Sequence, residues 1–346
     1  MANRDLIVVG ASAGGIEALD EVLAALPGSL SASILLVVHM PATGGPALQR
    51  ILRRHTDLEV VVARDGEPLQ HGRVYVAMGD RHLLVGPDQV QVRRGPRENG
   101  HRPAVDPLFR SAAAHFGPRV IGVILSGGLS DGTAGLLSIR QHGGLAVVQD
   151  PAEAVYDSMP RSALETVGAD YVAPAAAIGN LLADLVGGQT DPGEWKPGPI
   201  LRREAGVVQD DDPLDEDHLG RPSPWPCPDC NGVLWEIDDG PVLRFRCRVG
   251  HAWEAESLLE EQAEGVEGAL WMALRALEDR AALSRKLAER AEEAGRKLSA
   301  IRYRGDLDGM TRSIAILRRL LVHHPLRDTP TADDAAGRRG EEGTDG

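Results

Sequence analysis

The chain has 346 residues, of which 42% are hydrophobic and only 3% aromatic, and its formal net charge is −14. This length predicts two or three domains with packed cores. The acidic balance argues against nucleic-acid binding through phosphate contacts, and the scarcity of aromatics argues against stacking of single-stranded bases. The sequence shows neither a charged-then-apolar leader nor an apolar run of the roughly 18 residues that span a bilayer. We therefore expect a soluble, cytoplasmic protein with no membrane insertion.

Residues 5 to about 190 alternate short apolar runs with helical patterns, which predicts an α/β fold with a doubly wound, mostly parallel sheet. Strands are expected at 6–9, 34–38, 60–63, 120–125, 145–148 and 171–172, and helices at 106–116, 132–142, 161–167 and 175–185. Between residues 73 and 94 the pattern changes to three short runs separated by turn residues, which predicts an antiparallel hairpin or meander attached to the sheet.

A glycine-rich turn at residues 10–15 lies between the first expected strand and the helix that follows it. Such a turn can cradle a phosphate on the backbone amides of the helix N-terminus. It can also present Ser12 as a nucleophile, because residues 10–14 spell G-x-S-x-G in a strand–turn–helix context. The dinucleotide alternative fails twice: Ser12 replaces the second glycine of G-x-G-x-x-G, and His39 stands where an acidic residue would bind ribose.

Three polar residues follow three of the expected strands. Ser12 follows the first strand, His39 ends the second, and Asp131 follows the strand at 120–125. Because the carboxyl ends of parallel strands share one rim, these side chains are expected to converge. A serine needs a base to take its proton, and a carboxylate orients the imidazole. Singly, each residue also fits a structural role as a turn residue, a strand end or a helix N-cap. The three together predict a catalytic triad.

Five separated motifs in residues 3–187 resemble the catalytic domain of the chemotaxis protein-glutamate methylesterases, the CheB family. They are Gly10-Ala11-Ser12-Ala13-Gly14-Gly15, Val38-His39-Met40-Pro41, His101-Arg102-Pro103-Ala104-Val105-Asp106, Gly122-Val123-Ile124-Leu125-Ser126-Gly127 with Asp131-Gly132, and Met159-Pro160-Arg161. The resemblance implies hydrolysis of glutamyl methyl esters on chemoreceptors or similar helical signalling proteins, in some members with glutamine deamidation, and without a catalytic cofactor. It makes Ser12 the nucleophile, His39 the general base and acid, and Asp131 the residue that orients it. Backbone amides near Ala13 or Gly128 would then stabilise the oxyanion.

The sequence departs from this family pattern in three ways. Ala13 stands where the family usually has Thr, and Gly128 stands where it usually has Met. Family members in chemotaxis also usually begin with a phosphorylatable receiver domain, whereas here the catalytic domain begins the sequence, so we expect no regulation by phosphorylation in cis. These departures keep a second hypothesis open: an altered or inactive esterase domain that serves as a signalling scaffold.

All three cysteines lie between residues 227 and 247, in a C-x₂-C…C-x₃-H pattern. Cys227, Cys230, Cys247 and His251 predict a closed tetrahedral site for structural zinc, around a hairpin of the zinc-ribbon kind. The alternative is a small module with buried, unliganded cysteines. Because about 30 residues bury too little surface to fold without a staple, zinc is favoured.

The rest of the chain is assigned by composition and periodicity. We expect a methylesterase-like domain at 1–190, an acidic flexible linker at 191–224, the zinc-ribbon-like module at 225–253, a helical arm at 254–324 and a disordered tail at 325–346. In the arm, helices are expected at 255–298 and 306–321. Their apolar stripes predict an antiparallel hairpin, or a coiled coil that joins two copies or binds a partner.

Overall fold

The computed structural model describes residues 2–190, 196–206, 220–237 and 240–323. The chain divides into two compact units, residues 1–258 and 259–346. The disordered tail expected at 325–346 and the acidic runs of the expected linker lie outside the described residues.

The first unit is built on a seven-stranded sheet in which every neighbouring pair of strands is parallel. Its order is β10 (Tyr171–Ala173), β9 (Leu145–Gln149), β8 (Val120–Ile124), β2 (Leu6–Ala11), β3 (Ser33–Val38), β5 (Arg73–Val76) and β4 (Glu59–Val62). All residues of β2, β3 and β8 are buried, as expected for parallel strands covered on both faces. A two-residue pair, β1 (Ala2–Asn3) with β11 (Gln189–Thr190), is antiparallel.

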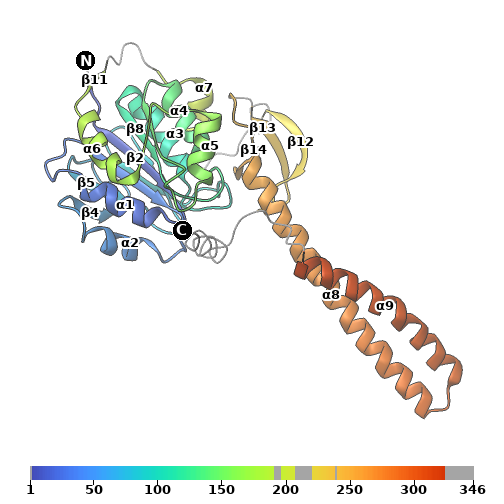
Figure 1. The fold of residues 1–346 in the computed structure, drawn as a ribbon. Coiled ribbons are helices and arrows are strands. Elements are labelled where there is room, and N and C mark those ends of the chain that lie inside the picture. The colour runs from blue at the N-terminus through green and yellow to red at the C-terminus, as the bar shows by residue number, and fades with distance from the viewer. Residues whose placement is uncertain (1, 191–195, 207–219, 238–239, 324–346) are drawn as a thin grey trace, which may run out of the picture. The chain divides into compact units, whose positions relative to one another are not determined.

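Helices cover both faces of this sheet (Figure 1). On one face lie α1 (Gly15–Ala24), α2 (Gly45–Leu52) and α6 (Ala175–Leu185), and on the other α3 (Val105–Phe116), α4 (Thr133–Gln141) and α5 (Ser158–Thr166). A short 3-10 turn, Gly117–Arg119, follows α3. Strand side chains alternate between the two cores: Ile7 and Val9 pack under α1, and Leu6 and Val8 pack under α3. The doubly wound α/β fold expected from the sequence is confirmed.

The segment at 73–76 corrects one expectation. It forms β5, which lies parallel to both β3 and β4 inside the main sheet, and not in an antiparallel meander. Its short Val-Tyr-Val run is buried on both faces. So short a run, with turn residues close by in the sequence, looks the same as a strand of a hairpin. Only β6 (His82–Val85) and β7 (Val90–Arg93) form the antiparallel hairpin.

The cysteine-containing module forms a second sheet within the same compact unit. It has the antiparallel order β12 (Arg221–Pro226), β13 (Val233–Ile237), β14 (Arg244–Cys247) and β15 (Ala252–Glu254). We call residues 221–254 the ribbon module. Its small core contains Leu234, Phe245 and Trp253 beside two cysteines.

The segment expected to be a flexible linker contains an ordered helix, α7 (Pro199–Gly206). Leu201 and Ala205 of α7 join the core on the α3 side of the sheet, and the Glu204 side chain is buried. Its two buried apolar side chains lie one turn apart, and the acidic residues around them in the sequence obscure so short a pattern.

The second unit is a pair of helices. Helix α8 (Ala255–Glu293) starts at the end of the ribbon module, and α9 (Lys297–His323) follows after a turn in which Gly295 has φ 71°. Helix α9 begins nine residues before the expected position, because Gly305 is accommodated inside the helix. Ion pairs Arg304–Glu292 (2.6 Å) and Arg318–Glu278 join the two helices as an antiparallel hairpin.

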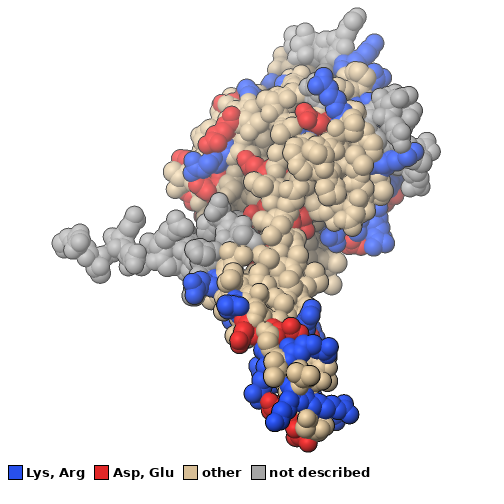
Figure 2. Space-filling model, turned by 90° about the vertical axis from the view of Figure 1, so that its right-hand side faces the viewer, with Lys and Arg blue, Asp and Glu red and all other residues tan. Residues whose placement is uncertain are grey.

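The surface of the helical hairpin combines charged and apolar side chains. Figure 2 shows Lys and Arg side chains, with Asp and Glu side chains among them, over the lower part of the helical arm. Met272, Leu298 and Ile316 are exposed on the same helices. Association of the arm with another copy or a partner stays a prediction. None of the described helices is both long and apolar enough to cross a membrane.

Candidate active site

The end of β2 presents Ser12 at the rim of the parallel sheet. The Ser12 backbone N–H donates to the Ser126 carbonyl (2.9 Å), which ties the turn after β2 to the turn after β8. Gly14 adopts φ 69° ahead of α1, a left-handed conformation that glycine takes without strain. The turn therefore leaves the extended strand abruptly and holds the Ser12 side chain, partly exposed, over the strand ends.

The three residues expected to form a triad lie in one hydrogen-bonded row. His39 Nδ1 lies 3.1 Å from Ser12 Oγ, and His39 Nε2 lies 2.7 Å from Asp131 Oδ2. Because an ionised carboxylate only accepts hydrogen bonds, Nε2 carries the imidazole proton and the Nδ1 lone pair faces the serine. The two ring nitrogens are thus used in the opposite sense from the standard Ser-His-Asp template.

Asp131 is held by four hydrogen bonds, two on each oxygen. Oδ2 accepts from His39 and from the Val105 N–H (2.7 Å), and Oδ1 accepts from the Asp106 N–H (3.3 Å) and from Asn99 Nδ2 (3.1 Å). The start of α3 can approach the end of β2 because Gly10 has no side chain. A Cβ at residue 10 would lie 2.3 Å from Val105 Cγ1. Burial alone would raise the Asp131 pKa, but the bonds from His39 and Val105 outweigh it and hold the pKa well below its usual range.

A second histidine stacks on the first. The His101 ring lies 3.7 Å from the His39 ring between centroids, with 17° between the planes. Burial, reinforced by the charge of His39, lowers the pKa of His101 to about 4. His101 is therefore neutral at pH 7, so it packs against His39 without opposing the positive charge that a catalytic base acquires.

The backbone around Ser12 offers two amides for a substrate oxygen. Within the described residues, neither the Ala13 nor the Gly128 N–H donates a hydrogen bond to another protein group, and both residues are at least partly exposed. Gly127 lets the loop after β8 approach: a Cβ on it would lie 2.8 Å from Ser12 Cβ and 2.1 Å from Met159 Sδ. The two candidate amides thus follow directly in the chain on two residues that lie close together, Ser12 and Gly127.

The ribbon module brings the four expected metal ligands together. Cys227, Cys230, Cys247 and His251 each offer a ligand atom, and these atoms all lie within 4.8 Å of one another. The Cys230–Cys247 sulfur separation is 3.7 Å, and His251 Nδ1 lies 3.5 Å and 3.8 Å from the sulfurs of Cys247 and Cys227. Tetrahedral zinc with Zn–S bonds of about 2.3 Å separates its ligands by about 3.8 Å, so the donor set fits zinc.

Buried charged residues fasten the ribbon module to the α/β core. Arg246 of β14, 1% exposed, lies 3.1 Å from Glu98 Oε1 and 2.8 Å from Glu204 Oε2, and Glu98 also receives Arg110 Nη2 at 2.7 Å and 2.6 Å. Burial opposes ionisation of both glutamates, but the arginines lower the pKa of each. The sequence-based reasoning missed this network, because its members are spread over some 150 residues.

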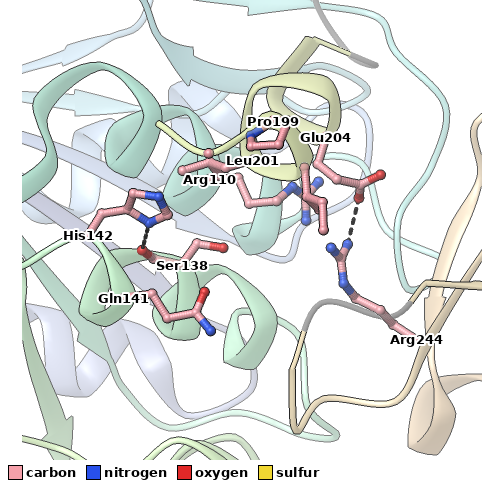
Figure 3. Close-up of a pocket in the computed structure, with 10 residues that line it drawn as sticks. Arg110, Ser138, Gln141, His142, Pro199, Leu201, Glu204 and Arg244 are labelled. Atoms are coloured by element: carbon pink, nitrogen blue, oxygen red, sulfur yellow. Dashed lines mark hydrogen bonds and ion pairs between the residues drawn. The ribbon is translucent and has the colours of Figure 1, made fainter. Parts of the chain in front are cut away.

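The same network borders a cavity of about 190 Å³ (Figure 3). Its lining comes from α3, α4, α7 and β14, including Ser138, Gln141 and Leu201. In Figure 3, Arg244 reaches from the ribbon module to Glu204 on α7, across the cavity from His142. None of the three triad residues lines this cavity.

A further buried carboxyl, Glu254, enters the α/β core from the ribbon module. Glu254 Oε1 accepts from the Ala134 N–H (3.1 Å) at the start of α4, close to Asp106. Burial and the neighbouring Asp106 raise the Glu254 pKa well above its usual range, and burial together with Asp131 raises the Asp106 pKa to about 6. The carboxyl groups of Glu254, Asp106 and the triad residue Asp131 therefore share one buried region.

We expect Glu254→Gln to stabilise the protein at pH 8 and to change little at pH 4. The folded-state pKa of Glu254 is above its unfolded value of about 4.3. Its contribution to stability is therefore complete below pH ~4.3 and is lost as the pH rises toward the folded pKa. Gln keeps the oxygen for Ala134 and does not titrate. In thermal unfolding, Tm should rise by at least about 2 °C at pH 8, whereas Glu21→Gln, on the exposed face of α1, should show no such pH-dependent gain.

Comparison with known proteins identifies the family of the α/β core. A family model described as CheB methylesterase matches residues 7–182. A protein of Leptospira interrogans named as a protein-glutamate methylesterase/protein-glutamine glutaminase is 40% identical over 184 residues, which cover 53% of this chain and 95% of the relative. A protein of Rhodospirillum rubrum with the same named activities is 42% identical over 175 residues, which cover 49% of this chain and 48% of the relative.

The solved catalytic domain of the Thermotoga maritima CheB methylesterase matches the fold. It aligns with a TM-score of 0.52 at 35% identity, over 54% of this chain and all of that domain. The family match, the parallel sheet and these relatives agree, and the chain belongs to the CheB methylesterase family.

Proposed function

We propose that this protein is a serine hydrolase that removes methyl groups from glutamyl methyl esters of proteins, with Ser12, His39 and Asp131 as its catalytic triad. The observation that carries the proposal is the unbroken row of hydrogen bonds from Ser12 through His39 to Asp131. The family and the names of the relatives support the same reaction class. Its substrates are methylated chemoreceptors or similar helical signalling proteins in the cytoplasm.

In the first half of the reaction, Ser12 Oγ attacks the ester carbonyl carbon while His39 Nδ1 takes the hydroxyl proton. Asp131 stabilises the resulting imidazolium and fixes the ring. The amides of Ala13 and Gly128 stabilise the negative oxygen of the tetrahedral intermediate, a contribution of about 10²–10³ in kcat for one such donor in other hydrolases. The carbon–oxygen bond to the methoxy group breaks, and His39 returns its proton so that methanol leaves.

In the second half, water hydrolyses the glutamyl-serine ester. His39 takes a proton from the water as it attacks the acyl carbon, and Ser12 recovers its proton as the ester bond breaks, which leaves a glutamate carboxylate on the substrate. With a glutamine side chain the same steps release ammonia, and the product is again glutamate. Both reactions require no cofactor.

The experiment is labelling of the full chain with a serine-reactive fluorophosphonate, together with methanol release from a methylated receptor fragment. An active esterase labels at Ser12, as read by peptide mass spectrometry, and releases methanol catalytically. A folded chain that does neither would favour the alternative, a signalling scaffold with an inactive esterase domain.

We also propose that Cys227, Cys230, Cys247 and His251 hold one structural zinc ion. The ligand separations support this assignment, and four protein ligands leave no open position for catalysis. The ion would fix the two knuckles of the ribbon module, whose own core is small.

A further inference from the structure

The ribbon module and the triad meet at one short loop, residues 97–101, between β7 and α3. One side of this loop faces the triad: His101 stacks on His39, and Asn99 donates to Asp131. Its other side is bonded to the ribbon module. The loop is therefore positioned by both parts of the first unit.

The ribbon side of the loop is held through β15, an edge strand of the ribbon sheet. The Ala252 N–H donates to the Arg97 carbonyl (3.2 Å), and the Asn99 N–H donates to the Ala252 carbonyl (2.8 Å). Glu98 thus forms a parallel bridge with Ala252, and its side chain is clamped by Arg246 of the neighbouring strand. Backbone and side-chain bonds fix the loop against the ribbon.

The hydrogen-bond pattern determines which way the Asn99 amide points. The Glu254 backbone N–H, which can only donate, lies 2.7 Å from Asn99 Oδ1. Asn99 Nδ2 consequently faces two carboxyl groups, Asp131 Oδ1 at 3.1 Å and Asp106 Oδ2 at 3.4 Å. The reversed amide would set N–H against N–H on one side and oxygen against carboxylate on the other. The Glu254 N–H therefore selects the orientation that supplies a donor to Asp131.

We propose that Asn99 is a positioning residue for Asp131, and that the ribbon module controls catalysis by holding the Asn99 amide in its donating orientation. Asn99 provides the side-chain donor to Oδ1, while Oδ2 is engaged by His39 and Val105. The amide thus holds the carboxylate against rotation away from His39. The kinetic part of this inference rests on the proposed esterase function; its spectroscopic part does not.

The backbone of Asn99 allows a clean test. Asn99 has φ 51°, a left-handed conformation that glycine and aspartate also adopt. Asn99→Gly removes the amide without backbone strain. Asn99→Asp keeps the shape and an acceptor for the Glu254 N–H, but supplies no donor to Asp131 when ionised. In the full chain, both variants should lower kcat for methanol release by about 10- to 100-fold, with KM within about threefold of wild type.

The control is the same change at a second left-handed asparagine. Asn231 has φ 56° and is exposed in the ribbon module, so Asn231→Gly should keep wild-type kcat. The spectroscopic measurement is the downfield proton resonance of the His39 Nε2–H bonded to Asp131, which should broaden or disappear in both Asn99 variants. Unchanged kcat and an unchanged resonance in folded Asn99→Gly and Asn99→Asp would overturn the positioning role. If the wild-type protein releases no methanol, the proposed function fails, and the His39 resonance alone then decides whether Asn99 positions Asp131.

The role of the ribbon module is tested by a matched pair at residue 254. Glu254→Ala and Glu254→Pro both lose the carboxyl, but only proline lacks the N–H that Asn99 accepts. That N–H points away from β14, so proline removes no bond within the ribbon sheet. The proline variant should have a kcat about 5- to 10-fold below that of the alanine variant, with a broader His39 resonance. Equal kcat values and equal His39 resonances in the two folded variants would show that the ribbon module does not determine the orientation of the Asn99 side-chain amide.

Discussion

Ser12→Ala should abolish methanol release while leaving the protein folded, with kcat lower by about 10⁴- to 10⁶-fold. Removing the nucleophile of a triad costs this much in other serine hydrolases, because base and orienting carboxylate then have nothing to activate. The Ser12 side chain is partly exposed and makes its one side-chain hydrogen bond to His39 within the described residues, so its loss costs little stability. The assay is methanol release from a methylated receptor fragment, alongside fluorophosphonate labelling.

Ser31→Ala supplies the matched control. Ser31 is exposed before β3, away from the rim that carries the triad, and its replacement should leave kcat and labelling at wild-type values. If Ser12→Ala retained more than about a hundredth of wild-type kcat with an unchanged Tm, Ser12 would not be the nucleophile.

The purified full chain should contain about one zinc ion, and Cys247→Ser should lose it and unfold the ribbon module. Metal binding contributes about 10–16 kcal/mol to the folding of zinc-finger peptides, far more than the few apolar side chains of this module provide. Metal content is measured by elemental analysis. Unfolding is measured by proteolysis and by the fluorescence of Trp253, which is 2% exposed in the folded module.

Val249→Ala is the companion variant, since Val249 lies in the same knuckle as Cys247 and is 63% exposed. It should keep the zinc and the folded module. A wild-type chain that carries no zinc, yet resists proteolysis between residues 221 and 254, would contradict the structural metal site.

The parallel sheet and the convergence of Ser12, His39 and Asp131 could be predicted because both depend on local patterns. Unbroken apolar runs mark buried strands, and the polar residue after each run marks the rim. The clustering of the four candidate metal ligands was predictable for the same reason, since two short sequence motifs contain them within 25 residues. The catalytic roles themselves stay proposals until the variants are measured.

Other features depend on contacts between distant segments. Asn99, His101 and Glu254 lie in stretches without periodicity, and only the fold shows that they surround Asp131 and His39. Arg246 looked like one more charge on a short strand, yet it is among the most buried side chains of the protein. The dipeptide Asn99-Gly100, which is typical of turns, was the local signal in the sequence for this loop.

The buried ion pairs of Glu98 affect where the chain can be truncated and which segment can be exchanged with a relative. The family match ends at residue 182, but the compact unit extends to Leu258. A truncation at residue 190 would remove Arg246 and Glu204, and leave Glu98 and Arg110 facing water across a newly bared surface. The segment that matches the family is therefore shorter than the compact unit to which it belongs. Any exchange of catalytic domains between relatives should therefore include the ribbon module. Otherwise Glu98 and Arg110, whose charges pair with the ribbon side, should be replaced.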